Sequence, residues 1–244
     1  MKAVGIIPAR FNSTRFPGKP LADIRGKTMI RRVYEQAEKC HALAGVFVAT
    51  DDERIIAEVN SFGGNAIMTS PKHTSGTDRC FEVLEKIGKD KYEVVVNIQG
   101  DEPFIHPEQI DKVVTCFHGK SHVQIATLAH QIADSRDLIN PGIVKIVRNV
   151  KGEALYFSRS PIPFIREAKN SDWTKFFTYL KHIGIYAYRS DVLEKIVKLP
   201  PSSLEKAESL EQLRWLENGY AITVELTDKE SFPVDYPEDL KKFI

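Results

Sequence analysis

Short apolar runs alternate with helical patterns through the first half of this chain, and this alternation is the feature that most narrows its possible folds. The apolar runs predict buried strands and are KAVGIIPA (2–9), GVFVATD (45–51), NAIMTS (65–70) and YEVVVNIQGD (92–101). Amphipathic helical patterns follow these runs at 27–40, 52–64, 75–88 and 106–117. Because strands and helices that alternate at this spacing build βαβ units, we expect an α/β protein with a mainly parallel sheet.

The second half of the chain has a different pattern. Residues 142–159 alternate apolar and polar side chains around Lys151 and Gly152, which predicts an antiparallel hairpin. Further strands are expected at 178–189 and 221–228, and further helices at 190–199, 202–219 and 237–244. We therefore predict one domain over residues 1–244, with an inserted and more antiparallel lobe at roughly 130–190.

Charge and cysteine content exclude several classes of protein. The 244 residues include 34 basic and 33 acidic side chains, so no overall field favours nucleic acid or an anionic membrane, and we expect neither as a partner. Three scattered cysteines argue against a disulfide framework. The N-terminal apolar run is too short for a signal peptide, and no later run is long enough to span a membrane. We expect a cytoplasmic protein.

A polar segment, PARFNSTRFPGKPL (8–21), follows the first predicted strand. Ligands of open α/β sheets bind beyond the carboxyl ends of the strands, and phosphate chains require cations and converging N–H groups. The segment offers such groups in Arg10, Ser13, Thr14, Arg15, Gly18 and Lys19. It matches neither a Walker A loop nor the G-x-G-x-x-G pattern of dinucleotide-binding folds. We interpret it as an anion-binding loop, with an ordinary solvated loop as the alternative.

Two acidic residues stand where they could hold a divalent cation. Asp101 ends the strand at 92–101, and Asp235 follows the last predicted strand, so both could face the crevice beside the polar segment. Taken alone, Asp101 could instead cap the following helix and Asp235 could form a turn. We read the neighbouring Glu102 as structural.

Several segments together resemble a known family. They are IIPARFNSTRFPGKPL (6–21), HTSGTDR (73–79), NIQGDEP (97–103), YFSRSPIPF (156–164), KHIGIYAYR (181–189), ESLEQLRWLENG (208–219) and VDYPEDL (234–240). In this order the chain resembles the cytidylyltransferases that activate acidic sugars, close to the 3-deoxy-manno-octulosonate (KDO) branch. Sialic-acid relatives carry a Gly-rich version of the first segment, which this chain lacks. The resemblance implies a three-layer, Rossmann-like nucleotidyltransferase fold with an inserted antiparallel dimerisation lobe.

The resemblance also implies roles for individual residues. Nucleotide binding falls to Pro8, Ala9, Arg10, Ser13, Thr14, Arg15, Lys19, Ser75, Gly76 and Arg79. Sugar binding falls to Gln99, Arg159, His182, Tyr186, Glu208 and Gln212, with Arg159 facing the sugar carboxylate. Glu208 and Gln212 are four apart and are expected on one helix face, although a solvated face is the alternative. Thr77 and Asp78 are expected to cap a helix, and His182 to bind or position rather than to act as a base.

The implied reaction transfers CMP from CTP to the anomeric C2 hydroxyl of KDO, giving CMP-KDO and pyrophosphate for lipopolysaccharide biosynthesis. Arg10, Lys19 and Asp101 would be catalytic, and Asp101 and Asp235 would hold Mg²⁺. CTP and KDO are then the substrates. Two alternatives stay open: a cytidylyltransferase for another acidic sugar or a polyol phosphate, and a non-catalytic nucleotide-binding module.

Aromatic residues gather in the predicted lobe. They are Phe164, Trp173, Phe176 and Phe177, which flank or follow two prolines. Clusters of this kind are usually core. In the resembling family the equivalent segment helps to form a dimer, so we expect a homodimer.

Overall fold

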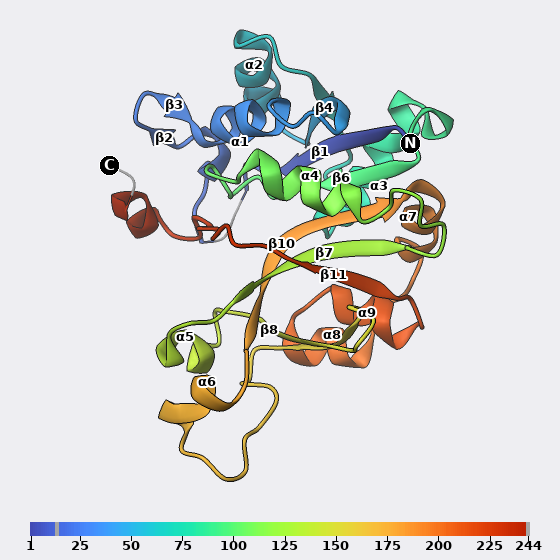
Figure 1. The fold of residues 1–244 in the computed structure, drawn as a ribbon. Coiled ribbons are helices and arrows are strands. Elements are labelled where there is room, and N and C mark those ends of the chain that lie inside the picture. The colour runs from blue at the N-terminus through green and yellow to red at the C-terminus, as the bar shows by residue number, and fades with distance from the viewer. Residues whose placement is uncertain (13–14, 243–244) are drawn as a thin grey trace.

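A mixed, mostly parallel sheet forms the centre of the computed structural model, which describes residues 1–12 and 15–242 (Figure 1). In spatial order its main strands are β11 (Ile222–Leu226), β7 (Ile125–Gln131), β10 (Leu180–Arg189), β6 (Val94–Asn97), β1 (Ala3–Ala9), β4 (Leu43–Thr50) and β5 (Ala66–Met68). β5, β4, β1 and β6 pair in parallel, as do β7 and β11, whereas β10 is antiparallel to both of its neighbours. The predicted α/β class is confirmed.

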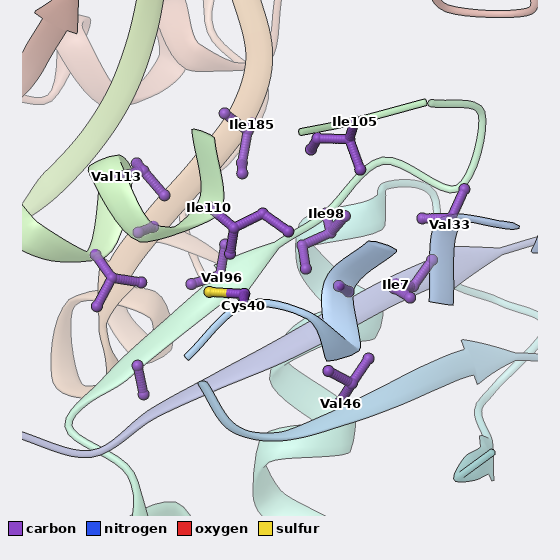
Figure 2. Packing of buried hydrophobic residues seen from close by; sticks show 14 of the residues in the cluster. Ile7, Val33, Cys40, Val46, Val96, Ile98, Ile105, Ile110, Val113 and Ile185 are labelled. Atoms are coloured by element: carbon purple, nitrogen blue, oxygen red, sulfur yellow. The ribbon is translucent and has the colours of Figure 1, made fainter. Parts of the chain in front are cut away.

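Helices cover both faces of this sheet because side chains of each strand alternate between two cores. Ala3 and Ile7 of β1 pack with α1 (Met29–Glu38), α2 (Glu53–Ser61) and α4 (Pro107–Thr115). Val4 and Ile6 pack on the opposite face with α3 (Gly76–Ile87) and α7 (Ser190–Ile196). Figure 2 shows the first core, where Ile7 and Val96 from the strands lie near Val33, Ile110 and Val113 from the helices. The result is the predicted three-layer arrangement.

The chain between β7 and β10 forms the inserted, more antiparallel lobe that the sequence predicts. It contains α5 (Ser135–Ile139), β8 (Lys145–Arg148), β9 (Ala154–Ser158), the 3-10 turn η3 (Asn170–Asp172) and α6 (Trp173–Phe176). β8 and β9 pair antiparallel around Lys151 and Gly152, and β8 also pairs with β10. Trp173 and Tyr179 are buried in a small separate core. The lobe projects away from the helices that cover β1 (Figure 1).

Two expectations for the second half are corrected. The predicted single helix at 202–219 is two helices, α8 (Ser203–Glu208) and α9 (Gln212–Glu217). Ser209 separates them because its backbone is left-handed, with φ of 53°, and the following Leu210 is buried. The predicted helix at 237–244 is a 3-10 helix, η4 (Pro237–Lys242), as far as the described residues extend.

Other elements were not predicted. β7 is a central strand that was not among the predicted strands, and a short hairpin of β2 (Asp23–Ile24) and β3 (Lys27–Thr28) leads into α1. Two 3-10 turns, η1 (Lys19–Leu21) and η2 (Lys89–Lys91), complete the described elements. No helix in the described ranges combines the length and the apolar character needed to cross a membrane.

Candidate active site

A small pocket lies at the carboxyl ends of β1 and β6, where the sequence predicts the ligand. Its volume is about 200 Å³, and it is lined by Pro8, Ala9, Arg10, Arg15, Lys19, Pro20, Gln99, Gly100 and Asp101. The two strand ends approach closely because residue 100 is glycine: a Cβ there would stand 2.7 Å from the carbonyl oxygen of Pro8. Ser13 and Thr14, also predicted to bind nucleotide, lie outside the described residues.

The polar segment after β1 folds back on itself. Gly18 has a φ of +73°, and its N–H donates to the carbonyl of Phe11 at 2.9 Å. The Phe11 ring fills the space beside Gly18 and carries the Arg54 guanidinium 3.3 Å above its centroid. This closure leaves Arg10 exposed at the pocket and brings Lys19 inward, so that two cations converge on one side of it.

Lys19 joins the two predicted metal ligands. Its ammonium donates to Asp101 Oδ2 at 2.8 Å and lies 3.8 Å from Asp235 Oδ1. Arg15 reaches the same Asp235 oxygen at 3.0 Å. The structure therefore brings Asp101 and Asp235 together around one cation, although they are 134 positions apart in the chain. Across the described ranges no group of three or more His, Cys, Asp or Glu side chains is placed to hold a metal.

The C-terminal segment reaches this site through backbone contacts. Val234 N–H donates to the carbonyl of Asp101 at 2.9 Å, and the Val234 carbonyl accepts from Lys19 at 2.8 Å. Ser231 donates to the buried Glu102 carboxyl, and burial, with a smaller contribution from Asp101, raises the pKa of Glu102 to about 8. These contacts give Glu102 the structural role expected of it. Asp101 does not cap α4, whose N-cap is His106.

A larger pocket of about 600 Å³ opens beside the first one. It contains four of the predicted sugar-binding residues, Gln99, His182, Tyr186 and Gln212. Gln99 and Asp101 line both pockets, so the two cavities meet at Asp101. Unpredicted residues also line the larger cavity, among them Lys181, Glu230, Ser231 and Phe232. Lys181 directly precedes His182 in a quoted segment, whereas nothing in the local pattern marks Phe232.

An irregularity in β10 shapes this larger pocket. Pairing with β7 slips between Ile183 and Tyr186, and the Thr127 hydroxyl contacts the carbonyl of Ile185 at 2.7 Å and His182 Nε2 at 3.0 Å. Desolvation lowers the pKa of His182 to about 3, so the imidazole is neutral, as suits a binding rather than a charged role. The Tyr186 hydroxyl and the Gln212 amide nitrogen are buried and lack a hydrogen-bond partner within the described part of the chain.

Arg159 and Glu208 lie together at the border of the larger pocket rather than in its lining. Glu208 accepts from Ser158 Oγ at 2.6 Å and from the Arg159 N–H at 2.9 Å. The Arg159 side chain donates to the carbonyls of Glu208 at 2.8 Å and Pro141 at 3.0 Å. Glu208 is the last residue of α8 and Gln212 is the first residue of α9. The two residues belong to different helices, so the expectation of one shared helix face is wrong. Their sugar-binding roles stay predictions.

The N-terminus of α3 brings Ser75 and Gly76 close to the first pocket. Ser75 caps the helix in a reciprocal pair with Asp78, so the expected capping role is confirmed for Asp78 but not for Thr77. A Cβ on Gly76 would stand 3.1 Å from the Pro8 ring, so glycine permits this close packing. Arg79 is fully buried and donates to Thr69 and Asp51 at 2.7 Å each. Its direct contact with nucleotide stays a prediction.

One contact between α3 and the segment before α9 (Gln212–Glu217) was not predicted from the sequence. The Thr77 hydroxyl at the start of α3 donates to Glu211 at 2.8 Å, and burial raises the pKa of Glu211. Glu211 directly precedes Gln212, so this hydrogen bond ties the start of α9 to the start of α3. Both residues fall in segments quoted above, but no local pattern pairs positions so distant.

A cation-rich loop at the ends of parallel strands, beside two carboxylates and a second cavity, is the arrangement expected of a nucleotidyltransferase. The family model described as cytidylyltransferase matches residues 4–229. The chain belongs to the cytidylyltransferase family, within the branch of 3-deoxy-manno-octulosonate cytidylyltransferases.

Relatives and a solved structure support this placement over the full length. The chain is 57% identical to the 3-deoxy-manno-octulosonate cytidylyltransferase of Parabacteroides distasonis, covering 99% of this chain and 96% of that protein. The corresponding protein of Bacteroides thetaiotaomicron is also 57% identical, over the same shares. A solved structure of CMP:2-keto-3-deoxy-manno-octonic acid synthetase complexed with CTP superposes with a TM-score of 0.91 at 46% identity, covering 99% of this chain and 96% of that one.

Proposed function

We propose that this protein transfers CMP from CTP to the anomeric C2 hydroxyl of KDO, releasing pyrophosphate, in lipopolysaccharide biosynthesis. The observation that carries the proposal is the meeting of two pockets at Asp101, one beside the cation-rich loop and one that contains the polar side chains of Gln99, Tyr186 and Gln212. Full-length similarity to KDO cytidylyltransferases supports the choice of both substrates.

The chain's own residues supply position and charge. A triphosphate in the smaller pocket would contact Arg10, Arg15 and Lys19, whose charges offset the negative charge that moves to pyrophosphate as it leaves. The sugar hydroxyl would approach the α-phosphorus from the larger pocket, where the two cavities meet. Tyr186 and Gln212 favour a ligand with many hydroxyls because their buried polar groups have no protein partner in the described ranges.

We propose that Asp101 and Asp235 hold Mg²⁺. The donor set fits this ion: two carboxylates suffice because Mg²⁺ keeps several waters and takes further oxygens from phosphates. The Lys19 ammonium between the two acids supports the fit, since the carboxylates already surround a cation. When bound, Mg²⁺ would offset phosphate charge and orient the α-phosphate.

Pyrophosphate release tests the activity. With Mg²⁺ present, we expect the purified protein to release pyrophosphate from CTP only when KDO is added, and not from UTP or ATP. Replacing KDO with N-acetylneuraminate tests the alternative acidic sugar. No release with any sugar acid would contradict the enzymatic function, and faster release with N-acetylneuraminate would contradict the choice of sugar.

Removing the metal tests the cofactor separately. Excess EDTA should abolish pyrophosphate release, and added Mg²⁺ should restore it, because no other ligand in the proposal neutralises the α-phosphate. Activity that persists in EDTA would refute the proposed Mg²⁺ dependence while leaving the transferase function intact.

We also propose that the protein is a cytoplasmic homodimer. Phe164 and Phe176 in the lobe are exposed by 71% and 68%, which is unusual for large apolar side chains and favours association through this face. Cys40, Cys80 and Cys116 are all free and buried, which fits a reducing compartment.

A further inference from the structure

Lys145, the first residue of β8, has a fully buried side chain with an unusual set of partners. Its ammonium donates to three backbone carbonyls, those of Asn140 at 2.9 Å, Ile143 at 2.6 Å, and Arg159. An ammonium has three donors, so these carbonyls satisfy all of them. No carboxylate is among its hydrogen-bond partners in the described structure. Lys145 therefore acts as a junction between backbone segments and not as half of an ion pair.

The segments that meet at this junction border the larger pocket. Gly142, Ile143 and Val144 line the pocket, and the Val144 carbonyl accepts from the backbone N–H of His182 at 2.8 Å. On the other side, the Arg159 guanidinium donates to the Pro141 carbonyl at 3.0 Å. One ammonium thus fixes the pocket wall of residues 142–144 and the backbone of the predicted sugar-carboxylate ligand at the same time.

Burial of this cation is unfavourable unless its donors are satisfied. Desolvation, with a further contribution from the Arg159 cation, lowers the pKa of Lys145 to about 8. The charged groups that face it are Arg159, which favours the neutral amine, and Glu208, which opposes that effect. A neutral amine offers only two donors, so its formation leaves one of the three carbonyls without a partner.

We propose that Lys145 is a positioning residue for the sugar acid, whose ammonium holds the wall of residues 142–144 and the Arg159 backbone in the conformation that binds the substrate. Lys145 itself touches no substrate. The inference rests on the proposed function, because it assigns the larger pocket to the sugar acid.

Steady-state kinetics of Lys145→Met test the proposal. Methionine keeps the length of the side chain but donates no hydrogen bond. We expect the KM for KDO to rise about tenfold or more, while the KM for CTP changes less than about twofold. Lys151→Met is the matched control, since Lys151 is an exposed lysine of the same lobe in the β8–β9 turn. It should keep both KM values. An unchanged KM for KDO in Lys145→Met, or an equal rise in both KM values, would overturn the proposal.

A pH series gives a second readout that does not depend on the variant folding. In the parent protein the KM for KDO should rise as the pH passes through about 8, because the ammonium that orders the pocket wall is lost, while the KM for CTP stays level. Lys151→Met should follow the parent. Lys145→Met should show a raised KM for KDO whose rise with pH is smaller than in the parent, and the rise that remains belongs to Glu102, a second residue of this pocket with a pKa of about 8. A KM for KDO that stays level from pH 7 to 9.5 in the parent contradicts the role of the ammonium.

The outcomes separate this inference from the proposed function. If the parent releases no pyrophosphate with CTP and KDO, the proposed function fails first. If the parent is active but its KM for KDO is insensitive to pH and to Lys145→Met, only the positioning role fails.

Discussion

At the scale of single residues, Lys19 links the two acids of the site in the free protein. Its ammonium stands 2.8 Å from Asp101 and 3.8 Å from Asp235, while the Val234 carbonyl accepts a third contact. We expect a bound triphosphate to compete with these carboxylates for the same cation. Nucleotide binding should therefore involve an exchange of partners at Lys19, and the free carboxylates would then be available to a metal ion.

Asp101→Asn tests the catalytic part of this arrangement. The amide keeps the shape of the side chain but loses its negative charge, so we expect kcat to fall at least about 100-fold, or ~2.7 kcal/mol, with little change in the thermal midpoint of unfolding. Asp90→Asn, an exposed aspartate of η2, is the control and should keep the activity of the parent. The rate of pyrophosphate release at saturating CTP and KDO gives kcat. A kcat of Asp101→Asn within about tenfold of the parent value would rule out a catalytic role for the charge of Asp101.

The residue scale also shows how far a sequence can predict a site. The position of Arg10 and Lys19 followed from a general rule on strand ends, and the structure places them at that edge. Asp235 was different, because only the family resemblance distinguished it from an ordinary turn residue. Arg79 was assigned to the nucleotide from its segment, but its burial against Asp51 depends on packing that local sequence does not encode.

At the scale of elements, the apolar patterns predict the buried strands β1, β4 and β6 and the first helices, but not the buried central strand β7. The side chains of Thr28 and Ser75 cap α1 and α3. The misassigned helix at 202–219 has a leucine-rich pattern that continues across the break, but α8 buries none of its residues, whereas Leu210 and Leu213 after Ser209 are buried. Tertiary packing, rather than local propensity, places Ser209 in the left-handed conformation.

Substitutions at Ser209 test the origin of this break. Ser209→Gly should raise the free energy of unfolding by about 0.5 kcal/mol. Glycine removes the strain energy of the left-handed backbone, and this gain slightly exceeds the entropic cost of ordering a more flexible unfolded chain. Ser209→Val should lower it by about 1 kcal/mol. Ser61→Gly, at the last residue of α2, is the control of opposite sign. Urea unfolding measures all three, and a destabilised Ser209→Gly would show that the serine side chain stabilises the break.

At the scale of the whole molecule, the exposed aromatic residues of the lobe lead to a prediction about assembly. Phe176→Asp should convert the proposed dimer into a monomer, because a carboxylate would be buried without a partner in the interface. Met68→Asp, at an exposed position of the edge strand β5, is the control and should leave the assembly unchanged. Light scattering during size-exclusion chromatography gives the mass, and a parent protein that is already monomeric would contradict the proposed dimer.

The path of β10 has a consequence for building chimaeras of this protein. This single strand pairs with β8 in the lobe and with β6 in the central sheet. His182 directly follows the residues paired with β8, and Tyr186 is the first residue paired with β6. The lobe therefore cannot be exchanged with the lobe of a relative as an independent unit, because the exchange also affects residues that line the larger pocket. A graft that includes the donor's β10 would import part of the donor's sugar selectivity, and a graft that stops short of it would have to match a foreign β8 to the native edge.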